Sequence, residues 1–218
     1  SFIPQIKEVI QSTPEDCQIC LFSATMPKET LDITKKFLKS PEMILVKSEN
    51  LTLEGIAQFF IDVDKEEWKF ETLCDLYNTI AISQSIIYVN TKSRADWLSD
   101  MLIEKNFTVG VIHSSLEPVD RVRIMEGFRQ GTIRILISTD LLSRGIDVQN
   151  VRTVLNYDIP NNREAYIHRI GRSGRFGKKG IAINFTTRRD FRQLKDIEHF
   201  YGTEIVSMPK NISDYINS

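Results

Sequence analysis

The sequence predicts an α/β protein whose mostly parallel sheet is covered by helices on both faces, and two observations carry this prediction. Short β-branched or aromatic runs alternate with longer segments that place apolar residues at helical spacing. The short runs are almost continuously apolar, as is typical of parallel strands buried by crossover helices. The predicted strands are residues 19–22, 44–46, 58–61, 86–89, 109–112, 133–137, 154–157 and 181–185.

Helical spacing of apolar residues predicts five helices between and after these strands. They are residues 67–80, 94–104, 119–128, 163–170 and 190–200. We assign their apolar side chains to the core and give them no function. Ligands of open parallel sheets bind at the carboxyl ends of strands, so we expect chemistry in the loops that follow Val89, Ile112, Ile137 and Tyr157.

Composition excludes several classes of protein. With 41% hydrophobic and 26% charged residues among 218, the chain is neither collagen-like nor largely disordered. No apolar run approaches the ~18–20 residues that a membrane span needs, and the N-terminus lacks a secretory signal, so we expect no membrane association. Three cysteines, Cys17, Cys20 and Cys74, predict neither a disulfide framework nor a structural metal, which fits a reducing, intracellular compartment.

The net charge of −1 hides an asymmetry between the halves of the chain. Residues 1–110 carry 11 basic and 17 acidic side chains, and residues 111–218 carry 17 and 12. Arg94 is the only arginine of the first half, whereas thirteen arginines follow between Arg121 and Arg192. Guanidinium groups suit bidentate binding of phosphate oxygens, so the pattern favours a phosphate-rich ligand. The alternative is a solvated basic face, and charge alone does not decide between the two.

Residues 166–177, rich in arginine and glycine, give the densest functional signal. If this segment is helical, at about 100° per residue, its basic side chains fall within roughly 120° of one another. These side chains are His168, Arg169, Arg172 and Arg175. Crowded like charges repel, which indicates an anion opposite them, and we interpret the segment as a phosphate site. A solvated basic helix end is the alternative, and a structural role fits His168 as well as a catalytic one.

Two further loops follow predicted strands and offer hydroxyl groups and charges. Residues 138–147 combine Ser138, Thr139 and Asp140 with an Arg-Gly turn and Asp147. Backbone N–H groups and Thr139 could hold a nucleic-acid phosphate there, and Asp147 could accept from a ribose hydroxyl, although the first three residues could simply cap a helix. Residues 90–94 form a similar loop, which by itself is equally consistent with a polar turn.

Two patterns of nucleotide binding are missing from the sequence. There is no G-x-x-x-x-G-K-[ST] phosphate loop, and no pair of acids after a strand that suggests a magnesium site. The glycines at 171, 174, 177 and 180 do not follow the G-x-G-x-x-G dinucleotide pattern, which argues against a dehydrogenase.

Taken together, these motifs resemble the later motifs of a DEAD-box RNA helicase. The resemblance extends from about residue 17 to 206 and rests on Ser-Ala-Thr at 23–25 and on residues 86–92, 138–147 and 168–175. Residues 51–56 and 156–160 look like the initiation-factor-4A group of that family. Within this group, residues 66–70, 96–98 and 160–164 look most like the exon-junction-complex member.

The resemblance implies a RecA-like three-layer α/β/α fold. It assigns residues 1–47 to the C-terminal tail of a first, ATP-binding RecA-like domain, 48–55 to a linker, and 56–218 to the helicase C-terminal RecA-like domain. In that family two such domains close around ATP and one RNA strand, and the phosphate loop and magnesium acids belong to the first domain. ATP and Mg²⁺ are therefore implied for the full-length protein, and we expect neither to bind this chain alone, which should be inactive.

The resemblance also implies roles for the residues of the predicted phosphate site. Arg172 and Arg175 would be arginine fingers that reach the terminal phosphate of ATP. His168 and Arg169 would assist catalysis by coupling the two domains. The ribose would contact Asp147, with Gly145 beside it in the nucleotide site.

Contacts to RNA and to the first domain are implied in the same way. Thr91, Arg121 and Thr139 would hold the RNA backbone, while Ser23 and Thr25 would link the ATP state to domain closure. The family has Gln-x-x-Arg where this sequence has Pro-Val-Asp before Arg121, which puts one polar RNA contact in doubt.

Partners and rival functions follow from the resemblance. It implies single-stranded or duplex RNA as the ligand, held through its backbone and 2′-hydroxyls, and helical-repeat partner proteins of translation or splicing in the nucleus or cytoplasm. One alternative is a non-processive, ATP-dependent RNA clamp or scaffold. A DNA translocase of similar architecture is another, which a comparison of RNA with DNA would test.

Overall fold

A computed structural model describes residues 3–23, 34–35, 37–38, 40–44, 53, 55–80, 82–140, 151–173, 180–209 and 212. The chain divides into two units, Ser1–Lys47 and Ser48–Ser218, which we describe separately. Of the predicted linker, only residues 53 and 55 lie within the described part of the chain.

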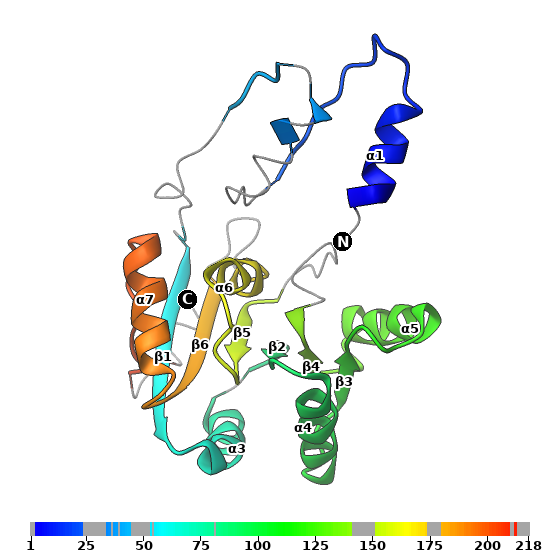
Figure 1. Cartoon of the computed structure of the whole chain (residues 1–218). Helices are drawn as coiled ribbons and strands as arrows, with labels where there is room; N and C mark the ends of the chain where they lie inside the picture. The colour runs from blue at the N-terminus through cyan, green and yellow to red at the C-terminus, as the bar shows by residue number, and fades with distance from the viewer. Residues whose placement is uncertain are drawn as a thin grey trace. The chain divides into compact units, whose positions relative to one another are not determined.

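The first unit contains helix α1 (Ile3–Gln11) (Figure 1). The strand predicted at residues 19–22 is wrong: these residues have no regular secondary structure. A strand needs a neighbour that accepts and donates its backbone hydrogen bonds, and the described residues of this unit form no second strand. Of the strand predicted at 44–46, Ile44 is described without secondary structure and residues 45–46 lie outside the described part.

Seven strands in the described part of the second unit form one sheet, in the order β3-β4-β2-β5-β6-β1-β7. Every pair of neighbours is parallel, which confirms the predicted sheet. The two residues of β7 escaped the analysis because so short a run carries no periodicity. The strands are β1 (Ile56–Asp64), β2 (Ser85–Tyr88), β3 (Val109–Ile112), β4 (Ile135–Ser138), β5 (Thr153–Asn156), β6 (Gly180–Thr187) and β7 (Val206–Ser207).

The helices of the second unit begin and end within two residues of their predicted bounds. They are α3 (Lys69–Thr79), which follows the 3₁₀ turn η2 (Glu66–Trp68), α4 (Lys92–Glu104), α5 (Pro118–Arg129), α6 (Arg163–Ile170) and α7 (Phe191–Tyr201). Among the described residues, no helix has both the length and the apolar character that crossing a membrane requires.

Alternate residues of the strands build a separate core on each face of the sheet. Ile87 of β2 packs in one apolar cluster with Leu73 of α3 and Leu98 of α4. Its neighbour Ile86 packs in another cluster with Phe128 of α5.

Side chains of α6 and α7 meet Ala182 of β6 in a third cluster. Ala182 pairs with Val154, which belongs to the α5 cluster, so the third cluster lies on the α5 face. The second unit therefore has the predicted three layers, with α3 and α4 on one face and α5, α6 and α7 on the other.

The strand register brings four loops to one edge of the sheet. Ile112 of β3, Ser138 of β4, Tyr88 of β2 and Asn156 of β5 lie side by side at the carboxyl ends of their strands. The loops that follow them therefore leave the sheet at the same level. We call this edge the carboxyl edge.

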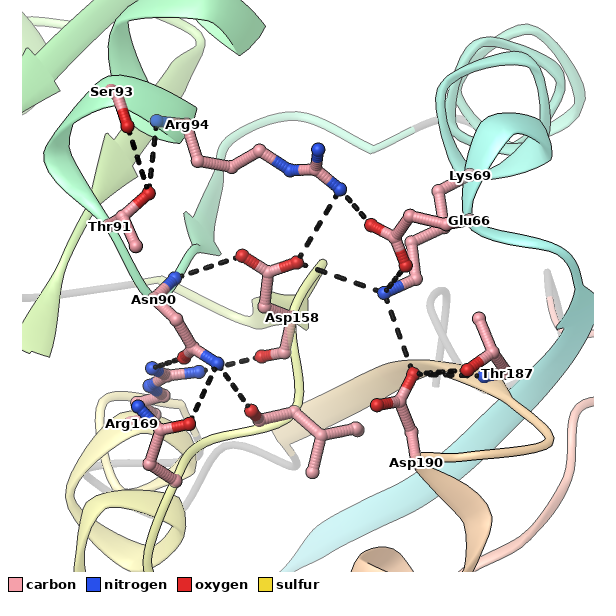
Figure 2. Close-up of polar contacts among 12 residues, drawn as sticks. Glu66, Lys69, Asn90, Thr91, Ser93, Arg94, Asp158, Arg169, Thr187 and Asp190 are labelled. Atoms are coloured by element: carbon pink, nitrogen blue, oxygen red, sulfur yellow. Dashed lines mark hydrogen bonds and ion pairs between the residues drawn. The ribbon is translucent and has the colours of Figure 1, made fainter.

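A buried lysine fixes one side of the carboxyl edge. The side chain of Lys69, at the start of α3, is only 3% exposed. Its Nζ lies 2.8 Å from Glu66 Oε2, 3.6 Å from Asp190 Oδ2 and 3.7 Å from Asp158 Oδ1 (Figure 2). Asp158 follows β5, and Asp190 lies between β6 and α7, so one cation ties the start of α3 to the segments that follow β5 and β6.

Arg94 of α4 joins the same charge cluster. It forms an ion pair with Glu66, and its guanidinium lies 5.3 Å from the centre of the Tyr157 ring. Burial raises the pKa of Tyr157 to about 12, so this ring stays neutral near pH 7 beneath the cation. The first turns of α3 and α4 are thereby held against the end of β5.

We predict that Lys69→Met lowers the free energy of unfolding by about 3 kcal/mol, because it removes a buried cation that faces the carboxylates of Asp158 and Asp190, and Arg94, 3.9 Å from Asp158, replaces only part of that charge. Lys65→Met is the matched control: Lys65 is exposed and its Nζ lies 4.9 Å from the centre of the Trp68 ring, so its loss should cost less than about 1 kcal/mol. Urea unfolding of the chain measures both. Equal losses for the two variants would contradict the prediction.

Candidate functional site

Two of the three residues predicted to hold an RNA backbone follow neighbouring strands at the carboxyl edge. Thr91 follows β2 and caps α4, because its hydroxyl accepts a hydrogen bond from the backbone N–H of Arg94 at 3.2 Å (Figure 2). Its side chain is exposed. Thr139 follows β4 and is partly buried, and its backbone N–H donates to the carbonyl of Ile112 at 3.4 Å. The loop of Thr91 therefore also caps a helix, and the residue remains exposed while it does so.

The third residue, Arg121 of α5, supports the loop after β3. Its Nε and Nη2 donate to the carbonyl of Leu116 at 3.0 and 2.8 Å, and Nη2 also donates to the carbonyl of Ser114 at 3.2 Å. Lys92 donates from Nζ to Ser115 Oγ at 2.7 Å, which joins the loops after β2 and β3. Hydroxyls and two cations thus gather at this end of the carboxyl edge, as is typical of surfaces that contact phosphates.

Helix α6 ends at residue 170, as its predicted bounds have it, and does not continue into the basic segment that follows. Helix α6 starts after Asn162, whose Oδ1 accepts from the backbone N–H of Ala165 at 2.7 Å, and it ends at Ile170. A Cβ atom at Gly171 would lie 2.8 Å from the carbonyl oxygen of Ile167, so a glycine is needed where the chain turns. Because the helix ends here, the described basic residues His168, Arg169 and Arg172 do not lie on one helix.

The three described basic residues of this segment differ in exposure. Arg169 is completely buried, whereas His168 and Arg172 are partly exposed. The Nε of Arg172 donates to the carbonyl oxygen of His168 at 3.3 Å, which ties the segment after α6 to the last turn of the helix. The anion expected opposite all the cations could therefore face His168 and Arg172, but Arg169 faces the protein interior.

Arg169 directs its guanidinium under the carboxyl edge. Nη2 donates to Asn90 Oδ1 at 2.8 Å (Figure 2). Nε donates to Asp140 Oδ1 at 2.6 Å. Nη1 donates to the carbonyl of Asp158 at 2.8 Å and to Asn156 Oδ1 at 3.3 Å. A buried charge needs such partners, and these come from the ends of β2, β4 and β5. Arg169 therefore locks α6 to three strand ends.

The ring of Tyr88 lies beneath this guanidinium, 5.3 Å from it. Burial raises the pKa of Tyr88 well above its usual value, and the charges of Arg172 and Arg169 oppose that rise. Tyr88 therefore presents a neutral, fully buried ring to Arg169, so the cation is covered by protein on this side as well.

Several predicted site residues cannot be placed. Thr25, Gly145, Asp147 and Arg175 lie outside the described residues. Ser23 is exposed in the first unit, which is described separately. Of the predicted site, the structure brings the loops of Thr91, Arg121 and Thr139, and the end of α6 with Arg172, to one edge of the second unit.

Sequence reasoning missed the polar residues that organise this edge. Lys69 shares the buried face of α3 with Leu73 and Leu76, at spacings of four and seven residues. A lysine on an apolar helix face was the available signal for a buried ion pair. Asn90 and Asp158 gave no comparable signal, because a polar residue after a strand is common in loops.

The sequence of the chain is similar to those of known helicases. The model of the helicase conserved C-terminal domain matches residues 68–177. The chain is 56% identical to an ATP-dependent RNA helicase eIF4A of Mycosarcoma maydis and 54% identical to an initiation factor 4A-III homolog of Oryza sativa subsp. japonica, each over 99% of this chain. It covers 52% and 53% of those relatives, so the chain spans about half the length of the curated relatives it matches.

Solved structures show the same likeness. Saccharomyces cerevisiae Dbp5 bound to RNA and ADP BeF3 matches 98% of this chain and 56% of its own, at a TM-score of 0.89 and 34% identity. A Dbp5 variant bound to Gle1 and IP6 matches 100% of this chain and 57% of its own, with a TM-score of 0.80 and 33% identity. A DEAD box protein of Methanococcus jannaschii matches 95% and 56%, with a TM-score of 0.67 and 38% identity.

These findings confirm the predicted fold and the resemblance to the initiation-factor-4A group. The relatives named above are RNA helicases or initiation factors of that group, and the structural neighbours are DEAD-box proteins. By sequence and by the order of its parallel strands, the chain belongs to the helicase conserved C-terminal domain family, in its RecA-like, DEAD-box branch.

Proposed function

We propose that this chain is the C-terminal part of an ATP-dependent DEAD-box RNA helicase. In this proposal it supplies arginine fingers to ATP held by a preceding domain and grips the RNA backbone. One observation carries it. The buried Arg169 belongs to α6, the helix that leads to Arg172, and it donates hydrogen bonds to Asn90 and Asp140, the chain neighbours of Thr91 and Thr139. The two proposed binding surfaces therefore share one rigid support.

On the nucleotide side, Arg172 and Arg175 would contact the terminal phosphate. A guanidinium placed there stabilises charge that develops on the transferred phosphoryl group, which is worth ~10³–10⁵ in rate. Asp147 would contact the ribose, with Gly145 beside it in the nucleotide site, and His168 and the buried Arg169 would help to couple the two domains. Mg²⁺ would bind with ATP to the preceding domain. The Dbp5 neighbour bound to RNA and ADP BeF3 supports a nucleotide and RNA as joint ligands.

On the RNA side, the hydroxyls of Thr91 and Thr139 and the cation of Arg121 would contact phosphates and sugars. Such contacts address the backbone, so binding should depend little on base sequence and fall steeply with salt. Because Arg121 also holds the carbonyls of Ser114 and Leu116, it would shape the loop after β3 as well as contribute charge.

Residues 1–47 would be the C-terminal tail of the first RecA-like domain, and 48–55 the linker. The side chains of Phe22 and Ile44 are 92% and 94% exposed, as expected of apolar residues that normally pack against further parts of a domain. Ser23 and Thr25 would connect the ATP state to domain closure. The length of the relatives supports this assignment, since the chain covers about half of them.

Partner proteins would act on the closure of the two domains. We propose helical-repeat proteins of translation or splicing, in the nucleus or cytoplasm, as these partners. The structure of a Dbp5 variant bound to Gle1 and IP6 supports the binding of a protein partner.

In the full-length protein, we predict that Arg172→Ala lowers RNA-stimulated ATP hydrolysis by about 10³-fold, since an arginine finger no longer meets the terminal phosphate. Arg188→Ala is the control, because that side chain is 86% exposed and pairs with Asp64 at 3.0 Å. Steady-state hydrolysis at saturating RNA measures both. The chain of 218 residues alone should show no turnover, and turnover abolished by Arg172→Ala in that chain would contradict the proposal.

We also predict that Thr139→Val weakens RNA binding about tenfold in the presence of a non-hydrolysable ATP analogue. The variant loses one hydrogen bond to a charged group, which is worth ~1.5–3 kcal/mol. Thr139→Ser keeps the hydroxyl and should bind as the wild type does. Fluorescence anisotropy with two RNAs of unrelated sequence measures the effect, which should be equal for both. A loss confined to one RNA would indicate base recognition instead.

A further inference from the structure

Asn90 lies between β2 and Thr91, and its amide is hydrogen-bonded on both sides. Its Oδ1 accepts from Arg169 Nη2 at 2.8 Å (Figure 2). Its Nδ2 donates to the carbonyl of Ile159 at 2.8 Å and, more weakly, to Asn161 Oδ1 at 3.3 Å. A guanidinium can only donate and a carbonyl can only accept, so these partners fix the orientation of the amide.

The backbone of Asn90 is held as firmly as its side chain. Its N–H donates to Asp158 Oδ2 at 2.9 Å, and the other oxygen of that carboxylate faces Lys69 and Arg94 at 3.7 and 3.9 Å. The position of Asn90 is therefore determined by Arg169 on one side and by Asp158, which faces Lys69 and Arg94, on the other. Thr91 follows Asn90 directly in the chain.

Asn90 completes a short path between the two proposed binding surfaces. Thr91 is its covalent neighbour on the RNA side. On the other side its amide bonds Arg169, which is completely buried and lies three residues before Arg172. The path from Thr91 to Arg172 thus crosses one hydrogen bond between side chains.

A displacement at one end of this path has an energetic cost at the other. If the loop of Thr91 moves, Oδ1 of Asn90 moves with it, and Arg169 must follow or lose one of its partners while remaining buried. Arg169 cannot turn to water instead, because its side chain has no exposed surface. A shift of the loop between two positions would therefore displace Arg169, and with it the end of α6.

We propose that Asn90 is a positioning residue that couples RNA binding at Thr91 to the placement of Arg172, acting through Arg169. The inference rests on the proposed function, because it takes Thr91 as an RNA contact and Arg172 as an arginine finger. It gives a role to Asn90, which the sequence placed in a polar loop and in a family motif without a function of its own. Asn90 itself touches neither ligand in this scheme.

Two substitutions at this position separate coupling from structural support. Asn90→Ala removes both the acceptor for Arg169 and the donor to Ile159. Asn90→Asp keeps an acceptor for Arg169 but sets a carboxylate oxygen against the carbonyl of Ile159 and places a second negative charge near Asp158. Asn90→Asp should therefore be at least as unstable as Asn90→Ala yet retain more of the coupling.

Gln58 provides a matched control. It is also a buried amide, 4% exposed, and it also bonds α6, since the hydroxyl of Tyr166 donates to its Oε1 at 2.8 Å. Its Nε2 donates to Thr203 Oγ1 at 2.6 Å, far in sequence from the loops of the carboxyl edge. Gln58→Leu should lower stability through lost buried hydrogen bonds and leave the coupling intact.

The test uses the full-length protein and compares ATP hydrolysis without RNA with hydrolysis at saturating RNA. For Asn90→Ala we expect the stimulation by RNA to fall about tenfold, within the usual 5–150-fold range of coupling between sites. Hydrolysis without RNA should change less than about twofold. Asn90→Asp and Gln58→Leu should keep most of the stimulation. If Asn90→Ala does not fold, Asn90→Gln replaces it, since its longer side chain displaces the acceptor from Arg169.

The outcomes distinguish this inference from the proposed function. A wild-type protein that RNA does not stimulate contradicts the proposed function. A stimulated wild type with equally stimulated Asn90→Ala overturns the coupling role alone. A loss of stimulation in all variants, ranked by their unfolding free energies, overturns it too and assigns Asn90 a structural role.

Discussion

The buried guanidinium of Arg169 is the interaction on which the carboxyl edge depends. A charge without exposed surface is tolerated only when its donors find acceptors, and here the acceptors come from the ends of three parallel strands. None of these strand ends can shift by itself without leaving a buried donor unpaired. The loops that begin there consequently keep a fixed arrangement relative to α6.

Asp158 connects this guanidinium with the second buried cation, Lys69. Its backbone carbonyl accepts from Arg169, while its carboxylate accepts from the N–H of Asn90 and faces Lys69 and Arg94. Asp158, which follows β5, thus joins α3 and α4 on one face of the sheet to α6 on the other. Charge pairing, added to the apolar cores of the two faces, makes the edge a single rigid support.

Such a support suits the function that we propose. Contacts to a nucleotide and to an RNA backbone both require cations and hydroxyls at fixed separations, because each must lie within hydrogen-bonding distance of a particular phosphate oxygen. The carboxyl edge offers hydroxyls from the loops after β2 and β4, and cations from α4, α5 and the end of α6. The rigid sheet holds these groups, whereas each loop alone would leave them mobile.

The helices and most strands of the second unit were predictable from the sequence, because their periodicity is local and each buried face repeats along its own segment. The sequence also determined which loops carry hydroxyls and charge, and through its motifs the family. Tertiary contacts were needed to show that Arg169 turns inward and that residues 19–22 form no strand. The pairing of Lys69 with Asp158 and Asp190 was decided by such contacts too, because each of these outcomes depends on partners distant in the chain, which no local pattern records.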